Sequence, residues 1–313
     1  MTPKISVVIP AYNSEKCIRE TLESVLNQTL SPHEIIVVDD GSKDNTVDVV
    51  KSFGDRIRYI RQDNQGIATA RNTGIHSATG DWIALLDHDD LWLPAKLEKQ
   101  AKVVTENPDL ICVYTTFAYL HVDGSLVEVP TFQAKNLWPA LRYRTPILPS
   151  TAIVKRSALI AVGGFQKQLS CIDDWNMWFR LVARYSANSF REISERLTLY
   201  RWWENNESKN FMPMMEAVLK QTDDLFLSDL TGVRRFVWKR QIEAKQFYNA
   251  SLALRELNDR RYLSYAMRSF MRWPLYGRVV SRGRYAVLAH MLINWPKAKF
   301  EAAPRLGTTE NRA

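Results

Sequence analysis

The segment Trp82-Ile-Ala-Leu-Leu-Asp-His-Asp-Asp-Leu-Trp92 is an apolar strand that runs directly into three acidic residues. Asp87, Asp89 and Asp90 lie within four positions, and unpaired carboxylates repel one another and are costly to desolvate. Side chains two positions apart on an extended chain share a face, so Asp87 and Asp89 can converge on one divalent cation, for which oxygen ligands favour Mg²⁺ or Mn²⁺. Alternatively, the acids form a turn that caps a following helix, with Pro94 at its first position.

Three predicted strands come before this segment. Ile5–Ile9 and Glu34–Val38 are continuous apolar runs rich in β-branched residues, which are typical of parallel strands covered on both faces, and Ile57–Ile60 is the third. Helix-like segments separate them, and Gly66–Gly74 predicts a short helix of small residues. This alternation predicts an α/β fold with a mixed, mainly parallel sheet that is flanked by helices.

Polar residues recur where these strands end. Tyr12 and Asn13 follow the first strand, Asp39 and Asp40 end the second, and Asp87 follows the fourth. A single loop acid is usually a turn or cap residue. Ligands of parallel sheets bind beyond the carboxyl ends of the strands, so the recurrence predicts one ligand-binding edge.

The regular alternation stops after a helix predicted at Ala95–Val104. Leu110–Tyr119 predicts a long strand and Val122–Ser125 a hairpin turn, so the second half of the sheet is expected to be mixed. The pair Asp173-Asp174 begins a helix whose apolar residues have core spacing, and it is interpreted either as part of a site or as a helix cap.

The cysteines and the apolar runs indicate the compartment. The 313-residue chain has three widely spaced cysteines, Cys17, Cys112 and Cys171, an odd number without metal-ligand spacing, which argues for the reducing cytoplasm. The sequence shows neither a signal-peptide pattern nor an apolar run long enough to span a bilayer, so we expect a protein that is not integral to the membrane.

Positive charge gathers in the last part of the chain. The formal net charge is +8, and from Thr231 onward there are 17 Lys and Arg against 5 Asp and Glu. Basic and apolar residues alternate between Tyr262 and Phe300, which suits a helix lying on an anionic membrane surface. A core-packed helical extension with a basic outer face is the alternative. The tail has no recognisable nucleic-acid-binding motif, so we expect no nucleic-acid partner.

Taken together, these motifs resemble the family-two inverting glycosyltransferases of the GT-A fold, which build bacterial cell-surface polysaccharides. The resemblance implies a GT-A domain at 1–206, with a nucleotide-binding half at 1–106 and an acceptor half at 107–206, followed by a helical basic extension at 207–313. It rests on Val7–Asn13, Ser24–Thr29, Val37–Ser42, Ala70-Arg-Asn72 within Gly66–Gly74, Gly80–Ile83, Leu86–Asp90 and Asp173-Asp174.

The resemblance also implies a nucleotide site. Tyr12 and its neighbours would surround the base, while Asp39 and Asp40 would bind uracil and ribose, because a carboxylate can accept from a base N–H and a ribose hydroxyl. Arg71 would approach the diphosphate, although a surface salt bridge is an alternative for it. The implied nucleotide-binding residues are Pro10, Ala11, Tyr12, Asn13, Asp39, Asp40, Arg71 and Asp87.

The catalytic groups follow from the same resemblance. Asp87 and Asp89 match the DxD pair that holds Mg²⁺ or Mn²⁺ against the two phosphates, with Asp89 the more direct ligand. Inversion requires a base that takes the proton of the acceptor hydroxyl, and Asp174 matches that base, with Asp173 as its orienting neighbour. In one departure, Trp203 stands where family members often carry a histidine, and an indole cannot ligate a metal.

The implied function is transfer of a sugar from a UDP-linked donor to a lipid-linked saccharide acceptor in surface polysaccharide or lipopolysaccharide synthesis. The implied location is the inner face of the cell membrane, as a peripheral protein. Trp203 motivates an alternative, a nucleotide-sugar-binding scaffold on the same fold whose catalysis is impaired.

Overall fold

The computed structural model describes residues 2–128, 137–169, 171–203 and 211–275, together with residues 279, 280, 283, 285 and 289. The chain divides into two compact units, Met1–Phe236 (unit 1) and Val237–Ala313 (unit 2). The domain boundary predicted after residue 206 lies outside the described residues and stays a prediction.

Unit 1 is built on one sheet with the strand order β3-β2-β1-β4-β8-β6-β9-β5, and β7 pairs with β6. Strands β1 to β4 are parallel, whereas β8 pairs antiparallel with both β4 and β6. The prediction of an α/β fold whose sheet becomes mixed in its second half is confirmed. The strands are β1 (Ile5–Ala11), β2 (Glu34–Asp39), β3 (Arg58–Arg61), β4 (Trp82–Leu85), β5 (Leu91–Trp92), β6 (Cys112–His121), β7 (Leu126–Glu128), β8 (Ala152–Lys155) and β9 (Phe190–Trp202).

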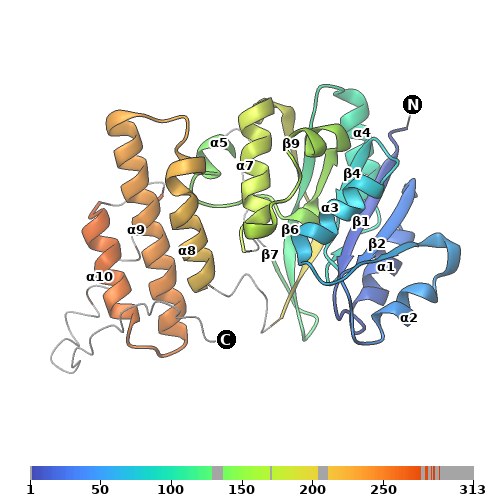
Figure 1. The fold of residues 1–313 in the computed structure, drawn as a ribbon, viewed down its shortest axis with the longest axis horizontal. Coiled ribbons are helices and arrows are strands. Elements are labelled where there is room, and N and C mark those ends of the chain that lie inside the picture. Colours follow the sequence, from blue (N-terminus) through green and yellow to red (C-terminus); the bar gives the residue numbers. More distant parts are fainter. Residues whose placement is uncertain are drawn as a thin grey trace, which may run out of the picture. The chain divides into compact units, whose positions relative to one another are not determined.

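Helices cover both faces of this sheet. Buried side chains of α1 and α4, such as Leu22 and Leu97, pack with alternate strand residues such as Val7 in one apolar core. Helix α3 packs closely on the other face, where a Cβ on Gly74 would lie 2.3 Å from Val8 Cγ1, and α7 lies on that side of the sheet too (Figure 1). The helices of unit 1 are α1 (Ile18–Leu26), α2 (Thr46–Lys51), α3 (Ile67–Ser77), α4 (Lys96–Glu106), α5 (Leu137–Ala140), α6 (Arg156–Ala161), α7 (Asp173–Tyr185) and α8 (Phe211–Gln221).

Unit 2 begins within helix α9 (Gly232–Glu256) and continues into α10 (Tyr262–Arg272). Within this unit the Ser269 hydroxyl donates to the Ala244 carbonyl over 2.6 Å, and the rings of Phe247 and Tyr265 lie 6.2 Å apart. The predicted helical character of the basic extension is confirmed here. Among the described helices, none is both long enough and apolar enough to cross a membrane.

The acidic residues after β4 do not cap a helix. Asp90 is followed by β5, and α4 begins only at Lys96, two residues after Pro94. The buried Asp90 side chain instead accepts a hydrogen bond from the Arg201 backbone N–H over 3.0 Å. The helix-cap alternative for this segment is therefore wrong, because the residues after Asp90 form a short edge strand and not the first turn of a helix.

Candidate functional site

One buried arginine joins the two groups of acids that the sequence singled out. Arg71, on α3, donates through Nη2 to Asp87 Oδ1 over 2.7 Å and through Nη1 to Asp173 Oδ2 over 2.9 Å. Its side chain is only 5% exposed, so the alternative of a surface salt bridge is wrong. The end of β4 and the first turn of α7 therefore meet at one place.

The residues around Arg71 explain how it is held. Asn72 exchanges two hydrogen bonds of 2.8 Å with the backbone of Phe165, whose ring centre lies 5.0 Å from the Arg71 guanidinium carbon. Gly164, with φ +62°, precedes Phe165, and a Cβ there would lie 2.3 Å from Asn72 Oδ1. A glycine is required for this close approach, which fixes Phe165 beneath the arginine.

Asp174 has the environment of a proton acceptor. Its side chain is half-buried, and Oδ1 accepts a hydrogen bond from the Trp175 backbone N–H over 2.6 Å. Burial, followed by the charge of Asp173, raises the pKa of Asp174 to about 7, with Arg71 acting in the opposite direction. A base is most effective when its pKa lies near the working pH. The pair does not occupy the N-cap position of the helix, because that position is Ile172. The Asp173 side chain accepts a hydrogen bond from Arg71 instead.

The carboxylates after β4 remain crowded in the folded chain. Burial and the neighbouring charges of Asp89 and Asp87 raise the pKa of Asp90 well above its ordinary value. One oxygen of Asp90, Oδ2, is buried without a hydrogen-bond partner. Burial also raises the pKa of Asp89. The positively charged side chains nearby therefore do not fully compensate the negative charge of these carboxylates.

A divalent ion fits this donor set. Asp87 Oδ1 accepts a hydrogen bond from Arg71 and Asp89 Oδ2 accepts one from Trp203. A carboxylate has about four acceptor sites, so both side chains keep capacity for a cation. No group of three His, Cys, Asp or Glu side chains within the described ranges is arranged to hold a metal alone. Mg²⁺ commonly binds through one or two carboxylates plus substrate phosphates, so this pair suits an ion that arrives with a phosphorylated ligand.

The predicted base-binding residues lie at the end of β1. Pro10 and Ala11 are buried in the strand, whereas Tyr12 is 41% exposed. Asn13 adopts a positive φ of 49°, and its side-chain oxygen accepts from the Lys43 backbone N–H over 2.8 Å. Tyr12 thus presents an aromatic surface at the predicted edge, while Pro10 and Ala11 support it from below.

Asp39 and Asp40 are both buried and hold surrounding loops. Asp40 accepts from the backbone N–H groups of Gln65 and Gly66 over 2.9 and 2.7 Å, which fixes the chain entering α3. Asp39 accepts from the Ser42 backbone N–H over 2.8 Å and from the Tyr59 hydroxyl. Each carboxylate oxygen has two lone pairs, so these contacts leave acceptor capacity for a ligand.

Two further features of the site lie beyond the acids and Arg71. Arg201 holds the acidic turn, donating to the Asp89 carbonyl over 2.8 Å and to Glu20 over 2.6 Å. Trp203 donates its indole N–H to Asp89 Oδ2 over 3.2 Å. Where a ligating histidine was expected, the chain therefore has a hydrogen-bond donor that orients Asp89.

The second feature is an aromatic cluster of four half-buried rings on β6 and β9. Tyr119 pairs with Tyr200 across the two strands, and its ring lies 5.8 Å from that of Tyr200 and 4.9 Å from that of Trp202. Phe117 completes the cluster, 5.4 Å from Tyr119. The cluster adjoins the acidic turn, because Trp203 follows Trp202 directly. Aromatic residues alternating along both strands were the sequence signal for it.

The chain is similar to known proteins both in sequence and in fold. The model of the family described as glycosyl transferase family 2 matches residues 6–162, which contain β1 to β4 and the acidic turn. The chain belongs to this family. It is 32% identical to an uncharacterized glycosyltransferase of Rickettsia prowazekii over 74% of this chain and 73% of that protein. Other Rickettsia relatives are longer, and the chain spans 31% of the length of two of them.

Solved structures share the fold of this family-2 chain. A structure of TarS from S. aureus in complex with UDP-GlcNAc matches with a TM-score of 0.61 at 19% identity, covering 86% of this chain and 81% of that one. The mannosyltransferase PcManGT from Pyrobaculum calidifontis, in complex with GDP-Man and Mn²⁺, matches with a TM-score of 0.58 at 20% identity, covering 94% and 80%. The GT-A fold expected from the sequence is confirmed.

Proposed function

We propose that this chain is a metal-dependent, inverting glycosyltransferase that moves a sugar from a nucleoside-diphosphate donor to a saccharide acceptor. The observation that carries the proposal is the pairing of Arg71 with both Asp87 and Asp173. It brings the acid of the donor side and the pair that contains the base into one site. Family membership, and relatives of the same fold in complex with UDP-GlcNAc and GDP-Man, support it.

On the donor side, we assign UDP as the nucleotide. Tyr12 offers its exposed ring to the base, with Pro10, Ala11 and Asn13 around it, and the carboxylates of Asp39 and Asp40 accept from the uracil N–H and the ribose hydroxyls. Arg71 adds positive charge near the diphosphate. Its Nε atom is buried without a hydrogen-bond partner, and an acceptor oxygen of a bound donor would satisfy it.

Asp87 and Asp89 would hold Mg²⁺ or Mn²⁺ between the protein and the diphosphate. When bound, such an ion stabilises the negative charge that develops on the departing nucleotide. The indole N–H of Trp203 keeps Asp89 in one orientation, and Arg201 fixes the backbone of the turn. These contacts preorganise the carboxylates, which lowers the cost of arranging them when the donor arrives.

The transfer step needs a base on the acceptor side. Asp174 takes the proton of the acceptor hydroxyl while the oxygen attacks the anomeric carbon and the sugar–phosphate bond breaks on the opposite side, which inverts the configuration. Asp173 pairs with Arg71, and burial together with the charge of Asp173 raises the pKa of Asp174 to about 7. The two neighbouring acids therefore have different tasks.

The aromatic cluster of Phe117, Tyr119, Tyr200 and Trp202 is proposed as part of the acceptor surface. Apolar faces of pyranose rings pack on aromatic side chains, which supply a large rigid contact area. Arg201 reaches toward α1, so its neighbours Tyr200 and Trp202 project from the opposite side of β9. The acceptor is proposed to be a lipid-linked saccharide in surface polysaccharide or lipopolysaccharide synthesis, met by a peripheral protein at the inner face of the membrane.

Asp89→Ala should weaken UDP binding in the presence of Mn²⁺ by about 100-fold, because it removes the more direct ligand of the ion. Binding without metal should change little, since the buried residues of β4 do not depend on this carboxylate. Isothermal titration with UDP, with and without Mn²⁺, measures both. Asp81→Ala, an exposed acid at the start of β4, is the matched control. Metal-dependent affinity at the parent level in a folded Asp89→Ala protein would refute the ligand assignment.

Trp202→Ala should raise the KM for a saccharide acceptor by roughly tenfold, equivalent to ~1.4 kcal/mol, with donor affinity unchanged. Steady-state kinetics with varied acceptor measure the effect. The control is Leu126→Ala, which changes an exposed apolar residue on β7. Strand β7 pairs with β6, so this variant reports on general damage to the sheet beside the aromatic cluster. A change in donor affinity with no change in acceptor KM would remove the aromatic cluster from the acceptor surface.

A nucleotide-sugar-binding scaffold without turnover is the second candidate. The observation that favours it is the contact of Trp203 with Asp89, since an indole at this position supplies no metal ligand. Donor hydrolysis, measured with and without Mn²⁺, separates the two candidates. Metal-stimulated hydrolysis supports the enzyme, whereas metal-independent binding without hydrolysis or transfer supports the scaffold.

A further inference from the structure

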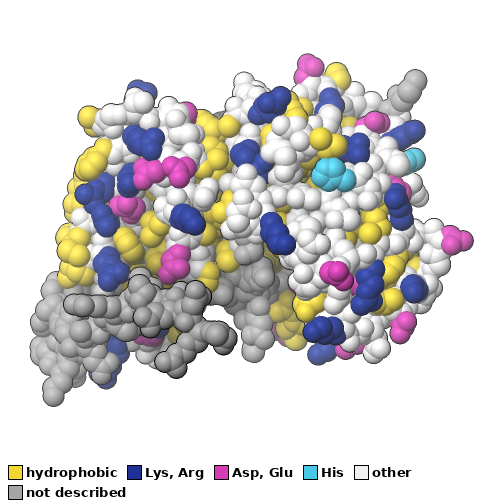
Figure 2. Space-filling model, viewed as in Figure 1, with side chains coloured by type: hydrophobic (Ala, Val, Ile, Leu, Met, Phe, Trp, Pro, Cys, Tyr) yellow, Lys and Arg dark blue, Asp and Glu magenta, His cyan; other side chains and the backbone are white. Residues whose placement is uncertain are grey.

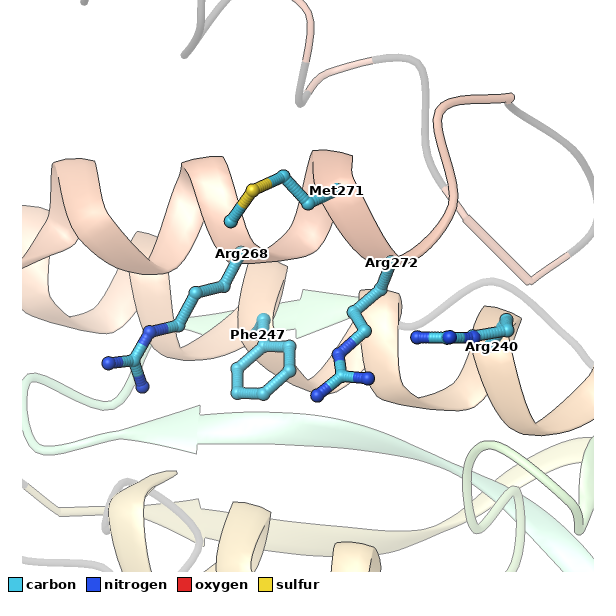
Figure 3. Close-up of a pocket in the computed structure, with 5 residues that line it drawn as sticks. All are labelled: Arg240, Phe247, Arg268, Met271 and Arg272. Atoms are coloured by element: carbon cyan, nitrogen blue, oxygen red, sulfur yellow. The ribbon is translucent and has the colours of Figure 1, made fainter.

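Unit 2 contains a cavity of about 330 Å³ between α9 and α10. Its lining consists of Arg240 and Phe247 from α9 and Arg268, Met271 and Arg272 from α10. Figure 3 shows Arg268 and Arg272 reaching down from α10 on either side of the Phe247 ring, with Met271 extending along α10 above them. We call this cavity the arginine pocket. The transfer reaction proposed above does not use it.

The charge in the arginine pocket is strongly positive. Among the described residues, the carboxylate of Glu243 forms ion pairs with Arg272 at 3.4 Å and with Arg240 at 4.0 Å. Glu243 is shared between Arg240 and Arg272, so the described lining of the pocket carries more basic than acidic side chains. Arg268 lies over the ring of Tyr265, at 5.2 Å from its centre, and is exposed to solvent. Several guanidinium groups directed at one space match the geometry of a phosphate group.

The surroundings of the pocket are apolar as well as basic. Met271, in the last turn of α10, is 67% exposed, and Leu275, three residues after the end of that helix, is 61% exposed. On the face shown in Figure 2, hydrophobic and Lys/Arg side chains lie close together over α9 and α10, with some Asp/Glu side chains among them. Large exposed apolar side chains next to a basic cluster are typical of helices that lie in the headgroup region of a membrane.

We infer that the arginine pocket binds the phosphate of an anionic phospholipid headgroup, while Met271 and Leu275 enter the boundary between headgroups and acyl chains. This inference deepens the membrane location that we proposed above and rests on it. Phe247, at the base of the pocket, gives the glycerol and upper acyl region an apolar contact. A free phosphate ion would use the arginines but would gain nothing from the three apolar side chains, so the lining favours a lipid.

The test compares two charge-matched double variants of the full chain. In Arg268→Glu/Arg272→Glu the pocket loses two cations and gains two anions. In Arg255→Glu/Arg260→Glu the same charge change is made at two exposed positions of unit 2 that do not line the pocket. Because the net charge is equal, any difference between the variants reports on the pocket and not on general attraction to the membrane.

Co-sedimentation with vesicles of phosphatidylcholine that contain phosphatidylglycerol measures the partition coefficient, because basic segments bind anionic membrane surfaces. We expect at least a tenfold loss for the pocket variant, a much smaller loss for the control, and little binding of the parent to vesicles of phosphatidylcholine alone. Equal losses in both variants would overturn the inference, since net charge alone would then explain binding. Equal binding of the parent to both kinds of vesicle would overturn it too.

A third variant and a soluble probe separate a lipid from free phosphate. Met271→Ser/Leu275→Ser should weaken vesicle binding while the arginines stay in place. If the parent instead gains thermal stability from inorganic phosphate, loses that gain in the pocket variant, and binds no vesicles, the pocket serves a soluble phosphate and the inference is wrong. UDP binding with Mn²⁺, measured on the same samples, reports separately on the proposed function, because the pocket residues take no part in it.

Discussion

Asp174→Asn should lower kcat for sugar transfer by about 10²–10⁴-fold, the usual contribution of a general base. The amide keeps the shape of the carboxylate and can still accept from the Trp175 backbone N–H, but it cannot take a proton from the acceptor hydroxyl. Donor affinity should therefore stay at the parent level, and the loss should appear in kcat. Steady-state transfer with a real acceptor measures it, since slow donor hydrolysis does not require the base.

Asp173→Asn is the matched control for this prediction. It changes the neighbouring acid, whose partner is Arg71, and should reduce kcat less than Asp174→Asn does. If Asp174→Asn transfers sugar at the parent rate while Asp173→Asn is inactive, the two roles are reversed. If neither variant loses activity, the base lies elsewhere.

The same assignment predicts the pH dependence of transfer. Burial and Asp173 raise the pKa of Asp174 from its ordinary value of 3.8 to about 7, and the ionised form is the active one. The rate should therefore fall as the pH drops below about 7, roughly tenfold for each unit, and Asp174→Asn should lack this limb. A kcat profile between pH 5 and 9 in non-interacting buffers measures it.

The raised pKa also has a consequence for stability. Between the ordinary value and the folded value the folded chain binds more protons at Asp174 than the unfolded chain does, so stability falls as the pH rises through that window. Asparagine removes this effect. Asp174→Asn should consequently be at least as stable as the parent at pH 8, which excludes unfolding as the reason for its lost activity.

Arg71→Met should destabilise unit 1 by about 3–5 kcal/mol, because it leaves the buried Asp173 and the half-buried Asp87 without their shared cation. The hydrophobic part of the side chain is kept, so the loss reports on charge more than on packing. Protonation of the stranded carboxylates relieves the penalty, and the loss should therefore be larger at pH 8 than at pH 5. Urea unfolding at both pH values, followed by tryptophan fluorescence, measures this difference.

Arg58→Met is the control for Arg71→Met. Arg58 pairs with Glu34 at 3.6 Å on the surface, with its side chain 50% exposed, and exposed pairs contribute about 0–1 kcal/mol. A loss for Arg71→Met no greater than that for Arg58→Met would show that the two acids do not depend on the buried arginine.

The sequence predicted most of what short-range patterns determine. The apolar runs Ile5–Ile9 and Glu34–Val38 became β1 and β2, and the polar residues after them lie at one edge, because parallel strands place their carboxyl ends together. The loss of alternation after α4 was also visible, and the sheet does become antiparallel at β8. At these positions the local sequence pattern and the topology of the sheet indicate the same structure.

Contacts between distant residues could not be predicted in the same way. Arg71 and Asp173 are 102 positions apart, and Trp203 and Asp89 are 114 apart, so no local periodicity links them. The sequence predicted that Arg71 approaches the diphosphate, with a surface salt bridge as the alternative, and it indicated a missing metal ligand at Trp203. In the fold, Arg71 is instead buried between Asp87 and Asp173. The indole N–H of Trp203 donates a hydrogen bond to Asp89.

The stereochemistry of the product tests the central claim most directly. With the UDP-sugar and Mn²⁺ combination that raises the melting temperature most, the anomeric configuration of the new linkage can be read from the proton coupling constants in NMR spectra. Direct displacement assisted by Asp174 predicts a β-linked product from an α-linked donor. An α-linked product would contradict this account, since one base acting in one displacement cannot retain the configuration.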